Sequence, residues 1–457
     1  MDSRRYSFVV VANRLPVDRT DDGWTRSPGG LVSALEPIAR GAHGAWVGWI
    51  GVPGDDVEPF EHDGVRLLPV QLSAEDVDRY YEGQSNSTIW PLFHHGVETP
   101  VHRRAWRVAY EEVNRRFADA AARVAAEGAT VWVHDYQLLL VPAMLREARP
   151  DLRIGFFLHI PFPPVELFMQ LPRRVDLLRG LLGADLVGFQ QSLAAHNFLQ
   201  LSARLLGLQP EGEQVRYDGR TVTARAFPIS IDVGEIEKLA ADHTVRAESR
   251  RLRRELGGDR TLLLGVDRLD YTKGIEQRIE AYGELLDDGT ISNREAVLVQ
   301  VATPSRMRVA QYQQLRERVE REVGRINGEF GDVGKAPVHY LFQSRTREEL
   351  VALYLAADLM LVTPLRDGMN LVAKEYVAAR SDERGALVLS EFTGAAEELP
   401  DAFQVNPYDT DDLERGIAAA LRADPADLTA RMRRMRAHIA DHDVNRWAQE
   451  FLDALGR

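Results

Sequence analysis

Cysteine is absent from the sequence, and its absence excludes several kinds of chemistry. The 457-residue chain can form no disulfide, hold no zinc through thiolates and use no catalytic cysteine. Such a composition is compatible with a reducing cytoplasm, where we expect the protein to act. Lysine is also scarce, at four of the 56 basic residues: Lys238, Lys273, Lys335 and Lys374. A lysine inside a polar cluster is therefore a more specific signal in this chain than an arginine.

The chain also lacks a basic excess and long apolar runs. Its formal net charge is −13 at pH 7, which argues against binding to nucleic acids or acidic membranes, because both need a basic surface. Its longest apolar runs, such as SFVVVANRL near the start, are far shorter than the roughly 20 residues of a membrane-spanning helix. The first residues, MDSRR, lead directly into a strand-like run, so we expect no signal peptide. We predict neither a nucleic-acid partner nor a membrane partner.

Two nucleotide-binding fingerprints are missing as well. No G-x-G-x-x-G follows an expected strand, and no G-x-x-x-x-G-K-[ST] occurs. A dinucleotide-dependent oxidoreductase and a P-loop NTPase thereby lose their usual sequence support.

The apolar pattern predicts an α/β protein. Short apolar runs alternate with longer amphipathic stretches, which is typical of βα units and parallel sheets. We expect one series of strands at 7–12, 45–50, 66–71, 130–134, 153–158 and 184–189, and a second series that starts near 261 and ends near 406. The interpretation is two doubly wound domains that face each other across a cleft, with boundaries at 1–233 and 234–439. An amphipathic helix at 440–457 is expected to pack back on the first domain.

Polar residues follow two expected strands of the second domain. Arg268 and Lys273 lie between a strand and a helix in GVDRLDYTKGIEQR, where helix-start N–H groups and cations attract anions. An ordinary capped turn is the alternative for this segment. Asp367 follows the apolar ADLMLV run in TPLRDGMNLVAKEY. Because ligands of open α/β sheets bind outside the carboxyl ends of strands, both turns are candidate sites.

Three further clusters belong to the first domain. Asp135 and His159 end two apolar strands in VWVHDYQLL and FFLHIPFPP. The His134-Asp135 pair fits a capping aspartate and a core histidine better than a metal site, because no other histidine stands at metal-ligand spacing. The loop YYEGQSNSTIWPLFHH mixes aromatic, small and polar residues, as a sugar-stacking wall does.

Taken in order, these clusters resemble the retaining glycosyltransferases that make trehalose 6-phosphate. The likeness spans nearly the whole chain and rests on ANRLP, the SPGG glycines, WVGW, YYEGQSNSTIWPLFH, HDYQLLLVP, FFLHIPFPP, RLDYTKG, PSR, RINGEFG and TPLRDGMNLVAKEYVA. Each fragment alone is modest, whereas the ordered set is specific. The resemblance implies a GT-B fold of two Rossmann-like domains. It also implies transfer of glucose from a nucleoside diphosphate to glucose 6-phosphate with retention, without metal or cofactor.

The resemblance also assigns residues to the acceptor and to catalysis. Five side chains would surround glucose 6-phosphate: Arg14, Trp49, Tyr81, Trp90 and Arg306. Five would act on the reacting sugars and the diphosphate: Asp135, His159, Arg268, Lys273 and Asp367. In these roles Asp135 would bind acceptor hydroxyls, His159 the donor glucose 6-hydroxyl and Asp367 its 3-hydroxyl.

The remaining donor residues follow from the same motifs. Gly29 and Gly30 would form a mobile loop over the diphosphate, and Glu375 would bind the ribose. The turn after the strand would supply its backbone to the sugar and diphosphate: Gly368, Met369, Asn370 and Leu371. Lys374 is expected to be structural or to face solvent.

One position departs from the uridine-using members of the family. Arg345 stands where they place an aromatic residue, and an arginine can pair with guanine O6 and N7. GDP-glucose is therefore one donor hypothesis, UDP-glucose is the other, and Arg345 pointing to solvent is the alternative reading of this residue.

The resemblance also predicts a reaction route, and two alternative functions stay open. The resemblance favours front-face substitution, in which no side chain acts as nucleophile, over double displacement. A pseudo-glycosyltransferase that joins cyclitols and an inactive regulatory homologue are the alternatives. We expect a separate trehalose-6-phosphate phosphatase to act downstream, and the sequence leaves a homo-oligomer open.

Overall fold

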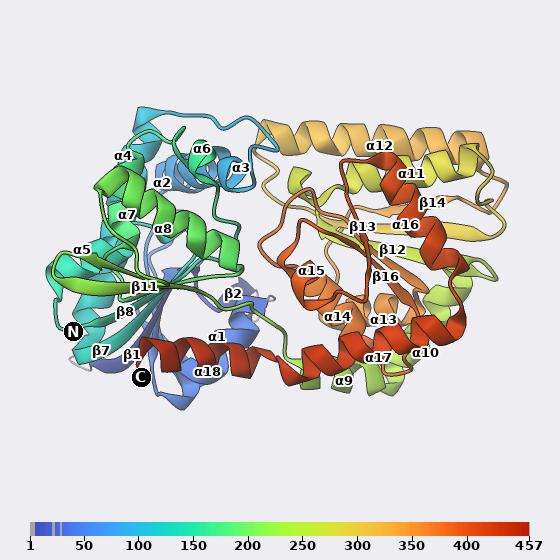
Figure 1. Cartoon of the computed structure of the whole chain (residues 1–457). Coiled ribbons are helices and arrows are strands. Elements are labelled where there is room, and N and C mark those ends of the chain that lie inside the picture. The colour runs from blue at the N-terminus through green and yellow to red at the C-terminus, as the bar shows by residue number, and fades with distance from the viewer. Residues whose placement is uncertain (1–4, 21–22, 28–29, 457) are drawn as a thin grey trace. The chain divides into compact units, whose positions relative to one another are not determined.

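The chain folds into two α/β units, each built around a mainly parallel sheet with helices on both faces (Figure 1). The computed structural model describes residues 5–20, 23–27 and 30–456. One compact unit comprises Met1–Ile229 with Asn445–Arg457, and the other comprises Ser230–Val444. The expected boundaries, after residues 233 and 439, stay a prediction.

The first unit contains a nine-stranded sheet in the described part of the chain. Its strand order is β10 (Gln214–Tyr217), β11 (Arg220–Ala226), β9 (Leu186–Phe189), β8 (Arg153–Phe157), β7 (Ala125–His134), β1 (Tyr6–Arg14), β4 (Ala45–Trp49), β6 (Val65–Pro69) and β5 (Phe60–His62). The pairs β10–β11 and β5–β6 are antiparallel and the other neighbours are parallel. The carboxyl ends of β8, β7, β1 and β4 therefore share one edge.

Helices cover both faces of this sheet. The main ones are α1 (Gly30–Gly41), α4 (Arg104–Val124), α5 (Val141–Ala148), α7 (Arg174–Leu181), α8 (Ser192–Leu206) and α18 (Val444–Leu455). The terminal helix α18 packs on the sheet through aromatic rings, because Phe451 stacks on Trp132 with ring centroids 4.4 Å apart. The indole of Trp447 also donates a hydrogen bond to the carbonyl of Phe227 at 3.1 Å. These contacts attach the end of the chain to the first unit.

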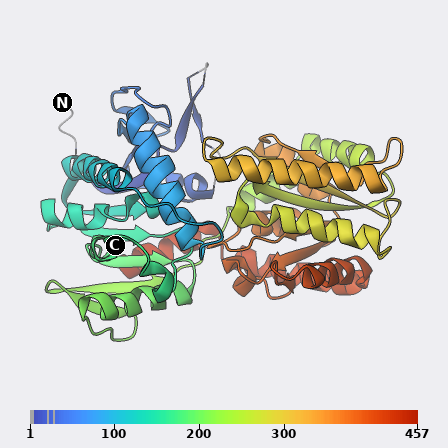
Figure 2. The ribbon, with the colours of Figure 1, turned by 90° about the horizontal axis from the view of Figure 1, so that it is seen from above.

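The second unit is a six-stranded parallel sheet, counted over the residues that the structure describes. Its order is β14 (Val338–Leu341), β13 (Ala296–Thr303), β12 (Thr261–Arg268), β15 (Leu359–Val362), β16 (Ala386–Ser390) and β17 (Phe403–Val405). The covering helices are α9 (Val233–Ala241), α10 (His243–Leu252), α11 (Ile275–Asp287), α12 (Ala310–Phe330), α13 (Arg347–Ala356), α14 (Leu371–Ala379), α16 (Thr410–Arg422) and α17 (Pro425–Asp441). Helices α11 and α12 lie side by side along one face of this sheet (Figure 2). Strands β12 and β15 are neighbours, so the turns that follow them meet.

The predicted α/β class and the main strands are confirmed. The elements that were not predicted have physical explanations. The hairpins β2 (Val17–Thr20)–β3 (Gly23–Arg26) and β10–β11 were not expected, because their short, polar strands carry little apolar periodicity. The aromatic-rich loop is a π-helix, η1 (Val77–Ile89), a rare form without a simple sequence signature. Among the described residues, none of the helices is long and apolar enough to cross a membrane.

Candidate functional site

The first unit carries a pocket beside the carboxyl ends of β1 and β7. The pocket has a volume of about 330 Å³. Its lining combines residues from the ends of these strands with residues of η1 and of the segment near α1, among them Asn13, Arg14, Tyr81, His134, Asp135 and Gln137. The predicted site residues Arg14, Tyr81 and Asp135 are therefore brought together in one cavity.

Arg14 is the cation of this pocket. Its guanidinium donates to the Asp18 carboxylate at 2.7 Å and lies 5.3 Å from the centroid of the Trp49 ring. Gly51 makes this position available: its φ is +89°, and a Cβ there would fall 2.1 Å from the Arg14 guanidinium carbon. Arg14 remains exposed, so a negatively charged ligand can approach it.

Of the three predicted aromatic residues, Tyr81 lines the pocket, whereas Trp49 and Trp90 are buried and do not line it. The Trp49 and Tyr81 rings lie 6.0 Å apart, and Tyr81 lines the pocket. Trp49 and Trp90 are each 4% exposed, and Trp90 packs between His94 and Tyr136, with centroids 4.1 and 5.5 Å away. The structure thus places Trp90 in the core behind η1 and not in the pocket lining, and its contact with substrate stays a prediction.

Asp135 adopts a backbone conformation that non-glycine residues rarely use. It follows β7 with φ of +75° and ψ of 169°, and its amide donates to the Phe157 carbonyl at 2.8 Å. Its carboxylate accepts a hydrogen bond from the amide of His159 at 3.2 Å. Such backbone strain costs about 1–3 kcal/mol and is concentrated at functional sites. A hydrogen bond from the His159 amide to the Asp135 carboxylate thus links the two residues.

His159 and His134 form a pair of neutral rings. The Nε2 atom of His159 lies 3.1 Å from Nδ1 of His134. Burial lowers the pKa of His159 to about 3, and burial together with His159 lowers the pKa of His134 well below its usual range. Both rings are therefore uncharged at neutral pH, and the Nδ1 atom of His159 is the one not engaged by His134.

Two pocket residues were not singled out from the sequence. His134 was interpreted as a core residue; it is fully buried but also lines the pocket. Gln137 lines it too, and its buried Oε1 has no hydrogen-bond partner among the described residues. Both belong to the HDYQ motif, whose strand-end position was the available signal.

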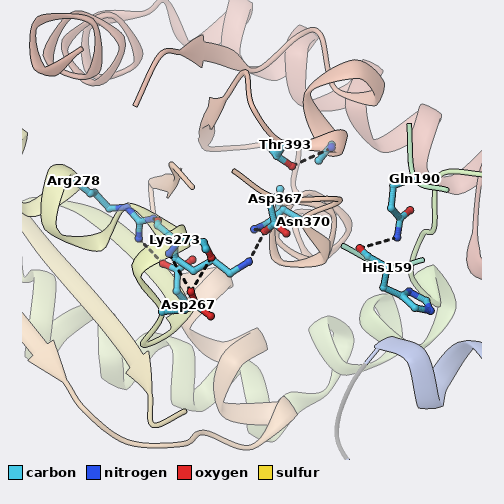
Figure 3. Close-up of polar contacts among 12 residues, drawn as sticks. His159, Gln190, Asp267, Lys273, Arg278, Asp367, Asn370 and Thr393 are labelled. Atoms are coloured by element: carbon cyan, nitrogen blue, oxygen red, sulfur yellow. Dashed lines mark hydrogen bonds and ion pairs between the residues drawn. The ribbon is translucent and has the colours of Figure 1, made fainter. Parts of the chain in front are cut away.

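The second unit joins the two predicted donor turns through an ion pair. Lys273 ends the 3-10 turn η4 (Tyr271–Lys273), which follows β12. Its ammonium lies 2.5 Å from Oδ2 of Asp367, the residue that follows β15 by a short turn. The same carboxylate oxygen accepts from the Asn370 side-chain amide at 3.2 Å (Figure 3). The sheet topology thus assembles two motifs 94 residues apart in sequence.

Backbone packing fixes the relative position of these turns. The amide of Leu365 donates to the Thr272 carbonyl at 2.8 Å. Gly274 has φ of +62°, and a Cβ there would fall 2.1 Å from the carbonyl oxygen of Thr363. A glycine is therefore required both by the conformation and by the contact.

A fully buried arginine supports the η4 turn from behind. Arg278, at 0% exposure, donates to the Asp267 carboxylate at 2.7 Å, to Gln300 at 2.9 Å and to Thr363 at 3.0 Å. Its guanidinium also donates to the Lys273 carbonyl at 3.3 Å. Figure 3 shows Arg278 and Asp267 next to Lys273. The network therefore holds the backbone from which the Lys273 side chain projects.

A second buried acid, Asp270, lies beside the turn. Its Oδ2 accepts from Arg306 at 3.2 Å and from the Tyr312 hydroxyl at 3.1 Å. Burial acts to raise the pKa of Asp270, but the cations Arg306, Arg268 and Lys273 outweigh it and lower the pKa to about 2. Arg306 is thus placed in the second unit, close to the cations of the donor turn, and its predicted contact with glucose 6-phosphate stays a prediction.

The remaining donor residues are placed as follows. Arg268 is exposed at the end of β12, and Asn370 caps α14 by accepting from the amide of Ala373 at 3.0 Å. The segment between Asp367 and the cap is mostly buried and leads to the first turn of α14: Gly368, Met369, Asn370 and Leu371. Gly30 begins α1, whereas Gly29 lies outside the described residues.

Three side chains of the second unit differ in their surroundings. Glu375 accepts from the Tyr354 hydroxyl at 3.0 Å, and burial raises its pKa. The Arg345 guanidinium pairs with Glu349 at 3.1 Å and is one-quarter exposed. Lys374 is buried and pairs with Glu398 at 2.5 Å, so of the two expected alternatives the structural one applies.

The comparisons with known proteins agree with this picture. A family model described as glycosyltransferase family 20 matches residues 6–457. The chain belongs to glycosyltransferase family 20. A trehalose-6-phosphate synthase of Mycobacterium sp. (strain JLS) is 58% identical over 98% of this chain and 96% of the relative. The resemblance stated from the motifs is thereby confirmed.

Two solved structures of the family carry substrate information. A UDP-forming α,α-trehalose-phosphate synthase from Burkholderia xenovorans in complex with glucose 6-phosphate has a TM-score of 0.91 and 35% identity, covering 98% of this chain and 100% of that one. The E. coli protein bound with UDP-2-fluoro glucose has a TM-score of 0.92 and 36% identity, covering 98% of both chains. This glycosyltransferase therefore shares its fold with relatives whose structures contain glucose 6-phosphate or UDP-2-fluoro glucose.

Within the described ranges, no group of three His, Asp or Glu side chains is arranged to hold a metal ion.

Proposed function

We propose that this glycosyltransferase moves glucose from a nucleoside-diphosphate glucose to glucose 6-phosphate with retention, which gives α,α-trehalose 6-phosphate. The observation that carries the proposal is the Lys273–Asp367 pair, which places a cation and a sugar-binding carboxylate together at the carboxyl ends of β12 and β15. The family relatives named above support the same reaction.

In this proposal the first unit supplies the acceptor-binding residues Arg14 and Asp135 and one donor contact, His159, and the second unit supplies the other donor-binding residues. Arg14 provides a positive charge for the phosphate of glucose 6-phosphate, and Asp135 provides a carboxylate for its hydroxyls. Neutral His159 meets the 6-hydroxyl of the donor glucose through Nδ1, because Nε2 faces His134.

We propose that fixed protein charges stabilise the departing diphosphate. An ammonium has three donors, so Lys273 can keep its bond to Asp367 and still donate to a phosphate oxygen. Arg268 and the free N–H groups at the start of α14 act in the same direction. In front-face substitution the leaving phosphate takes the acceptor proton, and no side chain forms a bond to the sugar.

The nucleotide base of the donor sugar has two candidates, uracil and guanine. The UDP-forming Burkholderia relative favours UDP-glucose. Arg345 favours GDP-glucose, because its guanidinium could pair with guanine and its buried Nε has no hydrogen-bond partner among the described residues. For guanine binding the Arg345 guanidinium would have to turn from Glu349.

The test is an incubation of the protein with glucose 6-phosphate and a panel of nucleoside-diphosphate glucoses. Release of a nucleoside diphosphate together with an α,α-linked disaccharide phosphate, identified by NMR, is the expected result. Release without a disaccharide phosphate from any donor would contradict the proposal. The ratio of kcat/KM for the UDP and GDP donors, in wild type and in Arg345→Ala, decides the base.

Intact-protein mass spectrometry tests the chemical route. Front-face substitution predicts no glycosylated enzyme under turnover, whereas a trapped glycosyl-aspartate would establish double displacement.

A further inference from the structure

The second unit contains an arginine-rich cavity that the proposed reaction does not use. It has a volume of about 740 Å³. Among the described residues that line it are five arginines and two aspartates: Arg250, Arg253, Arg254, Arg380, Arg384, Asp358 and Asp382. The other lining residues, from the ends of α10, α13 and α17 and from Gly385 before the strand β16, are uncharged. The cavity is therefore positively charged inside a protein of net charge −13.

Its floor is built from two immobilised arginines. Arg253 pairs with Asp358 at 3.1 Å. Arg380 is buried, pairs with Asp382 at 3.0 Å and donates to the carbonyl of Ala357 at 2.6 Å. These two pairs neutralise both aspartates of the lining.

Three arginines of the rim keep their charge uncompensated. Within the part of the chain that the structure describes, the side chains of Arg250, Arg254 and Arg384 make no hydrogen bond or ion pair. They come from α10, from the helical turn η3 (Arg253–Gly257) that follows it and from the loop before β16, so residues distant in sequence converge on one cavity. Each guanidinium offers a planar fork of donors that matches a phosphate group.

The cavity lies at the opposite edge of the sheet from the donor turns. Asp358 directly precedes β15 and Gly385 directly precedes β16, whereas Asp367 follows the carboxyl end of β15. Strands of four or five residues at about 3.3 Å per residue separate the two edges. A ligand in this cavity is therefore distinct from the nucleotide sugar.

We propose that this cavity is a second anion site, which binds a small phosphorylated metabolite with at least two negative charges. The volume suits a ligand of sugar-phosphate size, and three uncompensated guanidinium groups match two or more charges. The net negative charge of the whole protein disfavours a nucleic acid as the occupant.

The absence of cysteine allows a test that reports only on this cavity. Ser381 is exposed and lies between the lining residues Arg380 and Asp382, so Ser381→Cys gives a single thiol for an environment-sensitive fluorophore. Titration with inorganic pyrophosphate is expected to give a saturable change in fluorescence. An absent or unsaturable change would overturn the proposal.

Two triple variants distinguish pyrophosphate binding in the cavity from a general effect of removing three positive charges. Arg250→Ser, Arg254→Ser and Arg384→Ser together remove no ion pair and are expected to weaken the response at least tenfold. The matched variant replaces three exposed arginines outside the cavity, Arg216, Arg294 and Arg321, and is expected to keep the wild-type curve within twofold. Equal weakening in both variants, or none in the first, would contradict a specific site.

Calorimetry of the unlabelled protein removes any effect of the fluorophore. Wild type is expected to bind one more pyrophosphate than the cavity triple variant, whereas Lys273→Ala retains the cavity site. Equal stoichiometry in wild type and the cavity variant would count against the proposal. Because this result does not depend on turnover, it stands apart from the outcome for the proposed function.

Discussion

The ammonium of Lys273 lies 2.5 Å from the Asp367 carboxylate, and each residue is delivered by the end of a different strand. Lysine is scarce in this chain, so its presence at this carboxylate is a specific feature. The pair lies mostly away from solvent, with side-chain exposures of 11% and 13%. In such surroundings the interaction between charges is stronger than in water.

Lys273→Ala is expected to reduce kcat by about 10²–10³, because a preorganised donor to the leaving diphosphate is lost. Arg268→Ala is expected to act in the same range, and circular dichroism should show that both variants remain folded. Steady-state kinetics with saturating glucose 6-phosphate measure the effect.

Lys238→Ala is the control for Lys273, since Lys238 is an exposed lysine of the same unit. It should retain the wild-type rate. Near-wild-type turnover of both Lys273→Ala and Arg268→Ala would remove the role assigned to these cations.

Gly274→Ala is expected to damage the donor turns more than an ordinary glycine substitution. The new Cβ would fall 2.1 Å from a backbone oxygen of Thr363 in a conformation with φ of +62°. Gly289 has a similar φ of +75° but open space around its Cβ position, so Gly289→Ala carries the conformational cost alone. We expect Gly274→Ala to lose about 2 kcal/mol more unfolding free energy than Gly289→Ala, as measured in urea. Equal losses would show that the contact with Thr363 relaxes freely.

Much of this site was predictable from the sequence, because apolar strand runs and the polar residues after them are local patterns. Asp135, Lys273 and Asp367 were all identified in this way, and the parallel topology then brings the last two together. The Arg278–Asp267 pair was not identified, because a charged residue in a helical pattern usually faces water and its burial depends on partners from other strands.

Lys374 is another charged residue whose burial could not be decided from the sequence. It was expected to be either structural or solvent-facing, and only the packing of α14 shows that it is buried against Glu398. The π-helix η1 was missed because its distinction from a loop lies in backbone hydrogen bonds and not in apolar period. Burial of charge and unusual helices are thus the features that required the structure.

Gly51→Ala is expected to impair glucose 6-phosphate binding through Arg14. The added Cβ would occupy the present position of the Arg14 guanidinium, and this flexible side chain would move away. Loss of a charged hydrogen bond to the phosphate should raise KM for glucose 6-phosphate about tenfold, with little change in KM for the donor.

Gly54→Ala is the matched control, because Gly54 has φ of +80° but no atom within 4 Å of its Cβ position. It should leave KM for the acceptor unchanged. If both variants raised this KM equally, backbone strain rather than displacement of Arg14 would be the cause.

The His134–His159 pair predicts a loss of stability in acid. Burial lowers the folded-state pKa of His159 to about 3 from an ordinary value of 6.5, so between these pH values the unfolded chain binds more protons than the folded one. The free energy of unfolding should therefore fall as the pH is lowered below about 6.5, by about 1.4 kcal/mol per pH unit for this histidine.

Urea denaturation at pH 7 and pH 5 should show a smaller loss of unfolding free energy on acidification in His159→Gln than in wild type, whatever the effect of the substitution at pH 7. His196→Gln, at an exposed histidine, is the control and should lose as much unfolding free energy between pH 7 and pH 5 as wild type. If His159→Gln lost as much as wild type too, His159 would be protonated in the folded protein as readily as in the unfolded chain.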